Sequence, residues 1–354
     1  MVEQLKGFLK KNEAALIMSE ENISYFTAFH SSNGYLVVTD DKSYFLTDSR
    51  YVEAAQEKIR TVDEVLLLRS MKDDLYSLFD KLGVKKLHIE SDRITVKRFN
   101  DIVAATASRQ NVISDGKLDE AIGNIRIKKS KDEINKIITA QRIAEKAFDY
   151  ILSFISTEKT EKEVALELDY FMLKNGADAL SFDTIAVSGK NSSMPHGVPS
   201  DKKIERGDFI TLDFGAVVDF YHSDMTRTLA VGEVSSKQIE VYETVLEAQV
   251  KAIDAIKAGE SCYDIDKISR DIISEKGYGD YFGHGLGHGV GVEIHEAPSF
   301  NPSSNAVLEV GNIVTVEPGI YLPGEFGVRI EDMGAVTENG FYNFTTSEKK
   351  LIVL

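Results

Sequence analysis

Three things that the sequence lacks narrow what the protein can do. It has one cysteine, Cys262, so it cannot form an internal disulfide, which suits a reducing compartment. It lacks a net positive charge, because its formal net charge is −16, and this argues against nucleic acid and anionic membranes as partners. It also lacks an apolar run long enough to cross a membrane, and its first twenty residues lack the apolar core of a signal peptide. We therefore expect a soluble, cytoplasmic protein.

The length of 354 residues is enough for two domains, each with its own core. From Ala14 to about Ser114, strands such as AALIM, GYLVVT and SYFLT alternate with helical patterns, the last around residues 99–107. This alternation is typical of a complete α/β domain. The chain then becomes polar between Lys117 and Lys131. We predict an α/β domain over residues 1–122 and a second domain over residues 123–354.

The second domain repeats one order of elements, although its sequence does not obviously repeat. Capping boxes predict helices after Ser130, Thr160 and Ser235, and a further helix begins near Asp264. In each half, two helices are followed by a loop that contains histidine and then by an apparent β-hairpin with two acids. This order predicts a pseudo-twofold domain with one site shared between its halves.

The first of these hairpins, GDFITLDFGAVVDFYHSDMTRTLAV at 207–231, carries Asp213 and Asp224 among residues typical of a core. If its turn centres on Val218 and Asp219, antiparallel pairing places the two acids opposite each other. Like charges across a strand pair are destabilising, and an isolated buried carboxylate costs far more. A divalent cation between the acids would reverse this effect. Alternatively, one or both acids point to solvent from an edge hairpin.

Glu317 and Glu331 stand among β-forming residues of the second hairpin in the same way. The alternative that an acid points to solvent would have to hold separately for each of the four acids. A single metal site explains all four, because oxygen-rich clusters of this kind bind metal ions. The stretch FGHGLGHGVGVEIHEAP adds His284, His288 and His295. Its glycines argue against a helical zinc pair, and neither HExxH nor GxGxxG is present. We therefore expect irregular backbone brought close to a ligand.

Charge balance gives a reason for two ions. Four carboxylates and one neutral imidazole carry a charge of −4, which two divalent cations cancel. These five groups are too few for two separate coordination shells, so some carboxylates should bridge ions roughly 3.5 to 4 Å apart, as in two-metal hydrolytic sites. A carboxylate-rich site with one imidazole favours Mn²⁺ or Co²⁺, and Zn²⁺ or Fe²⁺ could also bind.

With these motifs, the sequence resembles the pita-bread metallopeptidases, and within them the Xaa-Pro group of prolidase (Xaa-Pro dipeptidase) and aminopeptidase P. The motifs are NSSMPHG, LDFGAVVDFYHSDMTRT, GHGLGHGVGVEIHE, TVEPGIY and GVRIED, with NISYFTAFHSSNGYLVVTDDKSYFLTDSRYVEAA in the first domain. They span almost the whole chain. The resemblance implies an α+β protein in which a creatinase/aminopeptidase-like pita-bread domain follows a smaller α/β domain like the N-terminal domain of creatinase.

The resemblance also implies which residues form the site. The metal ligands would be four carboxylates and one imidazole: Asp213, Asp224, His288, Glu317 and Glu331. Asp213, Asp224 and Glu331 would hold one ion, and Asp224, His288, Glu317 and Glu331 the other, so that Asp224 and Glu331 bridge. The substrate would be lined by His196, His284 and His295, and Arg329 would either support the metal ligands or position the substrate.

Peptide hydrolysis suggests a role for each of these groups. We assign Glu317 to take a proton from the attacking water and pass it to the leaving nitrogen. His295 would stabilise the developing oxyanion, and His196 would steady the bound peptide. His284 and Arg329 are candidates for the proline side of the substrate.

The resemblance, together with the predicted two-ion site, implies a dinuclear metal-dependent exopeptidase that cleaves between an N-terminal residue and proline, as an Xaa-Pro aminopeptidase or an Xaa-Pro dipeptidase. Its substrates would be short peptides with proline second, and the resemblance implies a homodimer. One alternative is a methionine aminopeptidase-like or broader aminopeptidase, although the first domain, His284 and the Arg329-x-Glu331 arrangement favour the Xaa-Pro group. The complete ligand set argues against a metal-free, creatinase-like enzyme. The alternative of another class is a non-catalytic binding protein with this fold.

Overall fold

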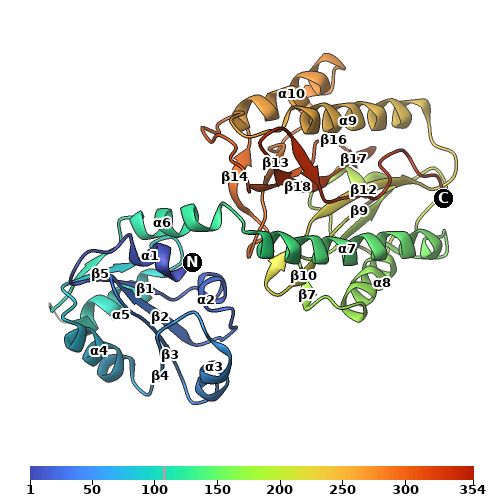
Figure 1. The fold of residues 1–354 in the computed structure, drawn as a ribbon. Coiled ribbons are helices and arrows are strands. Elements are labelled where there is room, and N and C mark those ends of the chain that lie inside the picture. Colours follow the sequence, from blue (N-terminus) through green and yellow to red (C-terminus); the bar gives the residue numbers. More distant parts are fainter. Residues whose placement is uncertain (107–108) are drawn as a thin grey trace. The chain divides into compact units, whose positions relative to one another are not determined.

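The computed structural model describes residues 1–106 and 109–354, and the chain divides into two units, Met1–Arg126 and Ile127–Leu354 (Figure 1). The boundary predicted after residue 122 falls inside helix α6 (Lys117–Arg126). Three side chains of this helix are buried, and Arg126 Nη1 donates a hydrogen bond to Asn22 Oδ1 at 2.7 Å. Because of these contacts, the whole of α6 belongs to the first unit.

A six-stranded mixed sheet forms the centre of the first unit, in the order β4-β3-β2-β1-β5-β6. Its strands are β1 (Glu13–Ile17), β2 (Gly34–Thr39), β3 (Ser43–Thr47), β4 (Glu64–Leu67), β5 (Lys86–Ile89) and β6 (Asn111–Ile113). The helices besides α6 are α1 (Val2–Lys6), α2 (Glu20–Thr27), α3 (Val52–Lys58), a π-helical turn (Met71–Leu75), α4 (Tyr76–Leu82) and α5 (Val96–Thr106). Strands β1 to β3 are buried at every position, which agrees with their nearly unbroken apolar sequences. The predicted helix end at Ala107 lies outside the described residues.

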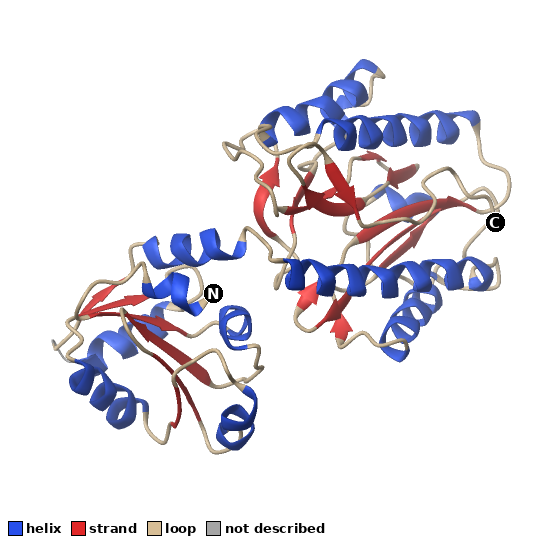
Figure 2. Ribbon diagram, in the orientation of Figure 1, coloured by secondary structure: helices blue, strands red, loops and turns tan. Residues whose placement is uncertain are grey.

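The second unit repeats an order of two long helices followed by strands. Its first half comprises α7 (Lys131–Phe154), α8 (Glu161–Lys174), β7 (Ala179–Leu180), β8 (Ile185–Ser188), β9 (Phe209–Phe214), β10 (Ala216–Val218), β11 (Tyr221–His222) and β12 (Met225–Ala230). Its second half comprises α9 (Ser236–Ala255), α10 (Cys262–Glu275), β13 (Gly287–Gly289), β14 (Glu296–Phe300), β15 (Ile313–Val316), β16 (Gly319–Leu322), β17 (Phe326–Arg329), β18 (Asp332–Val336) and β19 (Phe341–Asn343). Within this unit, most of the strands lie between α7 on one side and α9 and α10 on the other (Figure 2). The predicted α+β architecture is confirmed.

The predicted capping boxes fix where three of these helices begin. Ser130, Thr160 and Ser235 each accept a hydrogen bond from the backbone N–H three residues later, and the side chain at that position reaches back to the cap. Helix α10 begins at Cys262 rather than near Asp264, because the Ser261 side chain accepts the Asp264 N–H and is therefore the N-cap.

The register of the first hairpin differs from the predicted one by two residues. Asp213 on β9 lies opposite Thr226 on β12, so the predicted direct pairing of Asp213 with Asp224 is wrong. The turn centres on Asp219 and Phe220, whose φ angles are 48° and 73°. Positive φ at both central positions suits a two-residue turn that matches the twist of the strands. Because the shift is an even number of residues, Asp213 and Asp224 still belong to the same face.

The second hairpin carries its two acids at corresponding positions of its two arms. Strand β15 pairs with β18 and β16 pairs with β17, and in both stretches the numbers of partner residues add up to 648. The numbers of Glu317 and Glu331 also add up to 648, and both residues lie in the break between the two paired stretches. The break allows the chain to cross from one small sheet to the other at the level of the acids.

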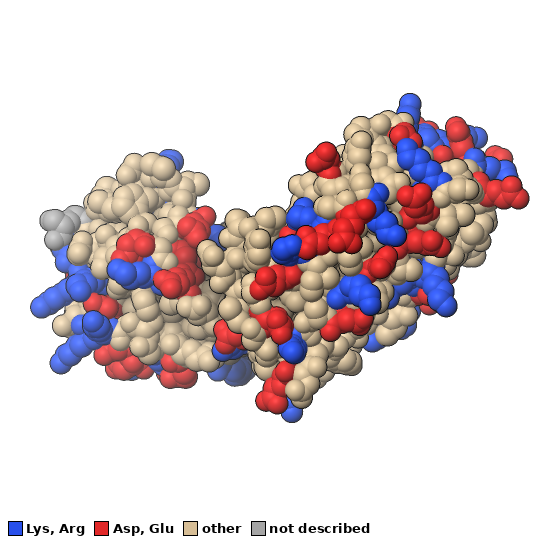
Figure 3. Space-filling view, turned by 90° about the horizontal axis from the view of Figure 1, so that it is seen from above, with Lys and Arg blue, Asp and Glu red and all other residues tan. Residues whose placement is uncertain are grey.

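The surface carries both signs of charge. On the face shown in Figure 3, acidic and basic side chains of the described residues lie interspersed. Among the described residues, the structure contains no helix that is both long and apolar enough to cross a lipid bilayer.

Candidate metal centre

All nine residues that the sequence predicts for the site line one cavity of about 630 Å³ in the second unit. They are Asp213, Asp224, His288, Glu317, Glu331, His196, His284, His295 and Arg329. The cavity therefore brings together the predicted metal ligands and the predicted substrate-lining residues.

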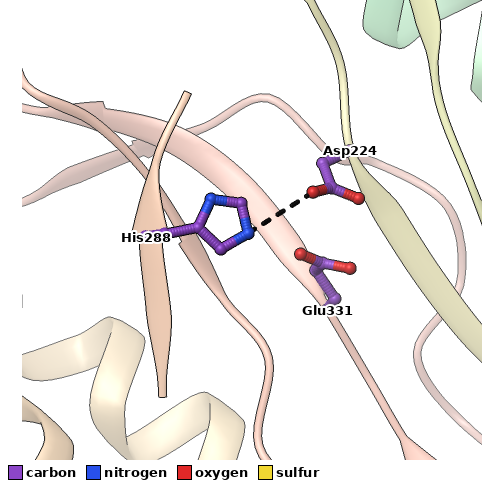
Figure 4. Close-up of side chains that lie close together, drawn as sticks. All are labelled: Asp224, His288 and Glu331. Carbon is purple, nitrogen blue, oxygen red and sulfur yellow. Dashed lines mark ion pairs between the residues drawn. The ribbon is translucent and has the colours of Figure 1, made fainter. Parts of the chain in front are cut away.

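Three of the five predicted ligands form a compact group. Figure 4 shows Asp224, His288 and Glu331 pointing toward one another, and one ligand atom from each lies within 4.8 Å of the others. His288 Nε2 is 3.6 Å from Asp224 Oδ2 and 3.3 Å from Glu317 Oε1. The group draws on both halves of the unit, because Asp224 directly precedes β12 whereas His288 is on β13 and Glu331 lies between β17 and β18.

The orientation of the His288 ring suits a metal ligand. Its Nδ1 lies 3.0 Å from the carbonyl oxygen of Gly289, and because a carbonyl can only accept, Nδ1 carries the proton. Nε2 is then the nitrogen with a free lone pair, and it faces the acids. Burial lowers the pKa of His288 to about 4, so the ring is neutral near pH 7. Metal-ligating histidines show this same arrangement.

The carboxylates are crowded and incompletely hydrogen-bonded. Among the described residues, no donor reaches the buried atoms Asp213 Oδ1 and Glu331 Oε1. Burial, followed by the charges of Asp213 and Glu317, raises the pKa of Asp224 well above its usual value. Burial, followed by neighbouring acids, does the same for Glu331. Burial raises the pKa of Glu317 to about 8. Divalent cations would satisfy both the open oxygens and the repulsion, so the residues fit a metal site.

These shifts predict how pH affects the metal-free protein. The raised pKa values mean that the folded protein holds protons on its acids that the unfolded chain releases near pH 4 to 5. The contribution of these acids to the free energy of unfolding is therefore fully present at low pH and is lost as the pH rises through about 8. The histidines with lowered pKa values contribute only below their ordinary pKa of about 6.5.

We expect the midpoint of thermal unfolding in chelator to be several degrees lower at about pH 9 than at about pH 7. Added Mn²⁺ should remove most of the difference. Midpoints that do not change with pH in chelator would contradict the electrostatic account of the site.

Arg329 links the acids to the wall of the cavity. Its Nη2 donates to Asp213 Oδ2 at 2.6 Å, its Nη1 to the Tyr321 hydroxyl at 2.8 Å, and its Nε to the Thr226 hydroxyl at 3.1 Å. The same Thr226 hydroxyl lies 2.7 Å from Glu331 Oε2. Arg329 is 4% exposed, so its charge offsets part of the negative charge of the acids inside the protein.

Tyr321 is a site residue that the sequence reasoning missed. Its hydroxyl also lies 3.0 Å from His284 Nε2, and burial raises its pKa to about 12, so it keeps its proton. A side chain on Gly319 would place a Cβ 2.5 Å from this hydroxyl. A sequence pattern that could have indicated this role is that Gly319 and Tyr321 are two residues apart on the strand that pairs with the strand of Arg329. Residues two apart on a strand lie on the same face.

The fold and this buried carboxylate–imidazole cluster define a two-domain metallopeptidase with a pita-bread domain. Residues 135–338 match metallopeptidase family M24, and residues 4–127 match the creatinase/prolidase N-terminal domain. The chain belongs to metallopeptidase family M24 and is a peptide hydrolase.

Similar proteins cover nearly the full length. The chain is 43% identical to an uncharacterized peptidase of Bacillus subtilis (97% of this chain, 96% of the relative) and 40% identical to an Xaa-Pro dipeptidase of Pyrococcus horikoshii (99% and 98%). Among solved structures, it resembles an Xaa-Pro dipeptidase from Bacillus anthracis with a TM-score of 0.94, at 42% identity and over 100% and 99% of the two chains. It also resembles an X-Pro aminopeptidase from Thermotoga maritima with a TM-score of 0.89, at 38% identity and over 97% of each chain.

Proposed function

We propose that this chain is a dinuclear metal-dependent exopeptidase that hydrolyses the bond between an N-terminal residue and proline, with Xaa-Pro dipeptides as its substrates. The observation that carries the proposal is the cluster of four acids and one neutral imidazole that opens into a cavity of about 630 Å³. This volume is ordinary for a small-molecule site. The names of the relatives at 40% and 42% identity support the choice of a dipeptide.

Two ions remain the best fit when Arg329 is counted. With its positive charge beside Asp213, the cluster carries about −3 rather than −4 when all four acids are ionised. Two divalent ions would leave one positive charge, which suits an anionic ligand, whereas one ion would leave the buried cluster negative. We propose Asp213, Asp224, His288, Glu317 and Glu331 as the ligands, with Mn²⁺ or Co²⁺ as the preferred ions. Bound ions would polarise the scissile carbonyl and lower the pKa of water.

Glu317 and His295 are placed to handle the proton and the developing charge. Glu317 Oε1 lies 3.3 Å from His288 Nε2, at the edge of the cluster nearest β13. We propose that this carboxylate accepts a proton from the attacking water and delivers it to the proline nitrogen as the C–N bond breaks. The His295 ring stands edge-on to the His288 ring with centroids 4.4 Å apart, so it can donate to the carbonyl oxygen of the substrate as charge develops there.

We propose His196, rather than Arg329, for the proline side of the site. All three guanidinium nitrogens already donate, to Asp213, Tyr321, Thr226 and also the carbonyl of Pro195. Arg329 therefore acts by holding Asp213 and Tyr321 in place. Both ring nitrogens of His284 are also engaged, Nδ1 with the carbonyl of Gly285 at 2.8 Å and Nε2 with the Tyr321 hydroxyl at 3.0 Å. His196, which is exposed on the cavity wall, remains for the terminal carboxylate of a dipeptide.

A three-substrate assay tests the proposal. We expect metal-dependent hydrolysis of Ala-Pro, no significant hydrolysis of Ala-Ala, and much slower cleavage of Ala-Pro-Ala. Chelator should abolish activity and Mn²⁺ should restore it. Activity that survives full metal removal would overturn the mechanism, and equal rates on Ala-Ala would overturn the specificity for proline.

The second candidate is an Xaa-Pro aminopeptidase, which the similarity to the Thermotoga maritima structure favours. Faster cleavage of Ala-Pro-Ala than of Ala-Pro would decide for it. The same proposed metal site and proton transfer would serve both reactions.

A further inference from the structure

The stretch that begins the second unit, Ile127–Ser130, is fixed to the rest of that unit through both backbone and side chains. The Lys129 N–H donates to the carbonyl of Gly311 at 2.9 Å, and Asn312 Nδ2 donates to the carbonyl of Ile127 at 3.1 Å. The two lysines of this stretch differ sharply in burial. Lys128 forms an exposed ion pair with Glu309, whereas the Lys129 side chain is only 2% exposed.

The buried ammonium of Lys129 is directed at one carboxylate. Its Nζ lies 2.8 Å from Glu296 Oε2, and the Glu296 side chain is 6% exposed. Glu296 directly follows His295 in the chain. Burying two charges costs desolvation, which the attraction between them offsets. Removing the charge of Lys129 would therefore take away part of what stabilises the Glu296 carboxylate inside the protein.

The Glu296 carboxylate holds the loop 290–295 together. Its Oε1 accepts the Glu293 N–H at 3.1 Å, and it packs so closely on Gly291 that a Cβ there would lie 2.5 Å from Glu296 Oε2. The Gly291 N–H in turn donates to the Glu293 carbonyl at 3.0 Å, and the carbonyl of Gly291 accepts the His222 N–H at 2.9 Å. The loop is thus folded around the carboxylate that Lys129 neutralises.

This loop connects two functional positions. It begins after β13, which carries His288, and it ends at His295, which lines the cavity. The rings of the two histidines are in contact. A loop that loses the carboxylate at its centre would let His295 move relative to His288.

We propose that Lys129 is a positioning residue for the active site: by neutralising Glu296 inside the loop 290–295, it fixes His295 in the cavity. Lys129 is not among the residues that line the cavity, and its ammonium pairs with Glu296, so it acts through Glu296. The catalytic part of this inference rests on the proposed function, whereas the structural part concerns the loop alone.

Kinetics of the metal-loaded full chain test the catalytic part. Lys129→Met, which keeps the length of the side chain without its charge, should lower kcat for Ala-Pro by about 10-fold to 100-fold with little change in KM. Lys128→Met is the matched control and should stay within about twofold of wild type, because exposed ion pairs contribute little. In a His295→Ala background, Lys129→Met should have less than about a twofold further effect. An equal loss in both backgrounds would show that Lys129 does not act through His295.

Hydrogen exchange tests the structural part without any assay of activity. Amides of residues 290–296 should exchange at least about tenfold faster in Lys129→Met than in wild type or Lys128→Met, with no change in α9. Unchanged exchange would overturn the proposal even if kcat fell. A wild-type protein that cleaves no proline peptide would refute the proposed function. If loop exchange is nevertheless faster in Lys129→Met, the structural role of Lys129 in the loop 290–295 would still be supported.

Glu296→Gln provides a second variant should Lys129→Met fail to fold. It keeps the volume of the side chain but cannot neutralise Lys129, so it should change loop exchange and kcat in the same direction. Wild-type exchange and kcat in Glu296→Gln would also overturn the proposal.

Discussion

Asp224→Ala is expected to abolish metal binding and peptide hydrolysis together. Asp224 is 5% exposed, it lies beside His288 and Glu331, and it is one of the proposed metal ligands. Its removal would take a ligand away from the bound ions. We expect kcat/KM for Ala-Pro to fall by at least roughly 10³-fold, the upper end of the loss for a single transition-state donor. Metal content of the purified variant, measured by elemental analysis, should fall with it.

The matched control for this variant is Glu247→Ala, which removes an exposed acid from helix α9. It should keep both metal and activity. The metal-free Asp224→Ala protein should be at least as stable as the metal-free wild type near pH 8, since the substitution also removes a repelling carboxylate. Full metal occupancy in Asp224→Ala would refute the assignment of Asp224 as a metal ligand.

Glu317→Gln is expected to lower kcat for Ala-Pro by roughly 10²-fold to 10⁴-fold, the usual contribution of a general acid–base group. The amide keeps the shape of the side chain and an oxygen that can coordinate, but it cannot accept the proton of water near pH 7. KM should change little, because the peptide is held by other groups. Steady-state kinetics with Mn²⁺ in excess measure the loss.

Glu325→Gln is the control on the same hairpin, where Glu325 forms an exposed ion pair with Lys237. It should behave as wild type. A kcat for Glu317→Gln within tenfold of wild type would assign the proton transfer to another group.

The positions of the four acids in the site followed from sequence because strand periodicity is local. Each acid interrupts a β-rich run, and the parity of a strand decides which face a side chain joins. The detailed register of the first hairpin did not follow, because it depends on the turn. The sequence alone did not show that Asp219 and Phe220, rather than Val218 and Asp219, take positive φ. The error left the shared face intact, since it was an even number of residues.

Contacts between distant parts of the chain could not be predicted from the sequence. Tyr321 acquires its role only when β16 pairs with β17 and His284 arrives from another loop. The pairing of Lys129 with Glu296 joins residues 167 positions apart. The periodicity of a sequence carries no information about such a contact. From the sequence, Lys129 could therefore not be distinguished from the other polar residues of a charged stretch.

The carboxylate pairs come from opposite halves of the larger unit, one from the first hairpin and one from the second. Any ions that bind among them would therefore fasten one half to the other, as a removable crosslink does. Loss of the ions would loosen the contact between the two halves before the core of either half unfolds. The working lifetime of the enzyme in chelating media would then be set by how slowly its ions escape.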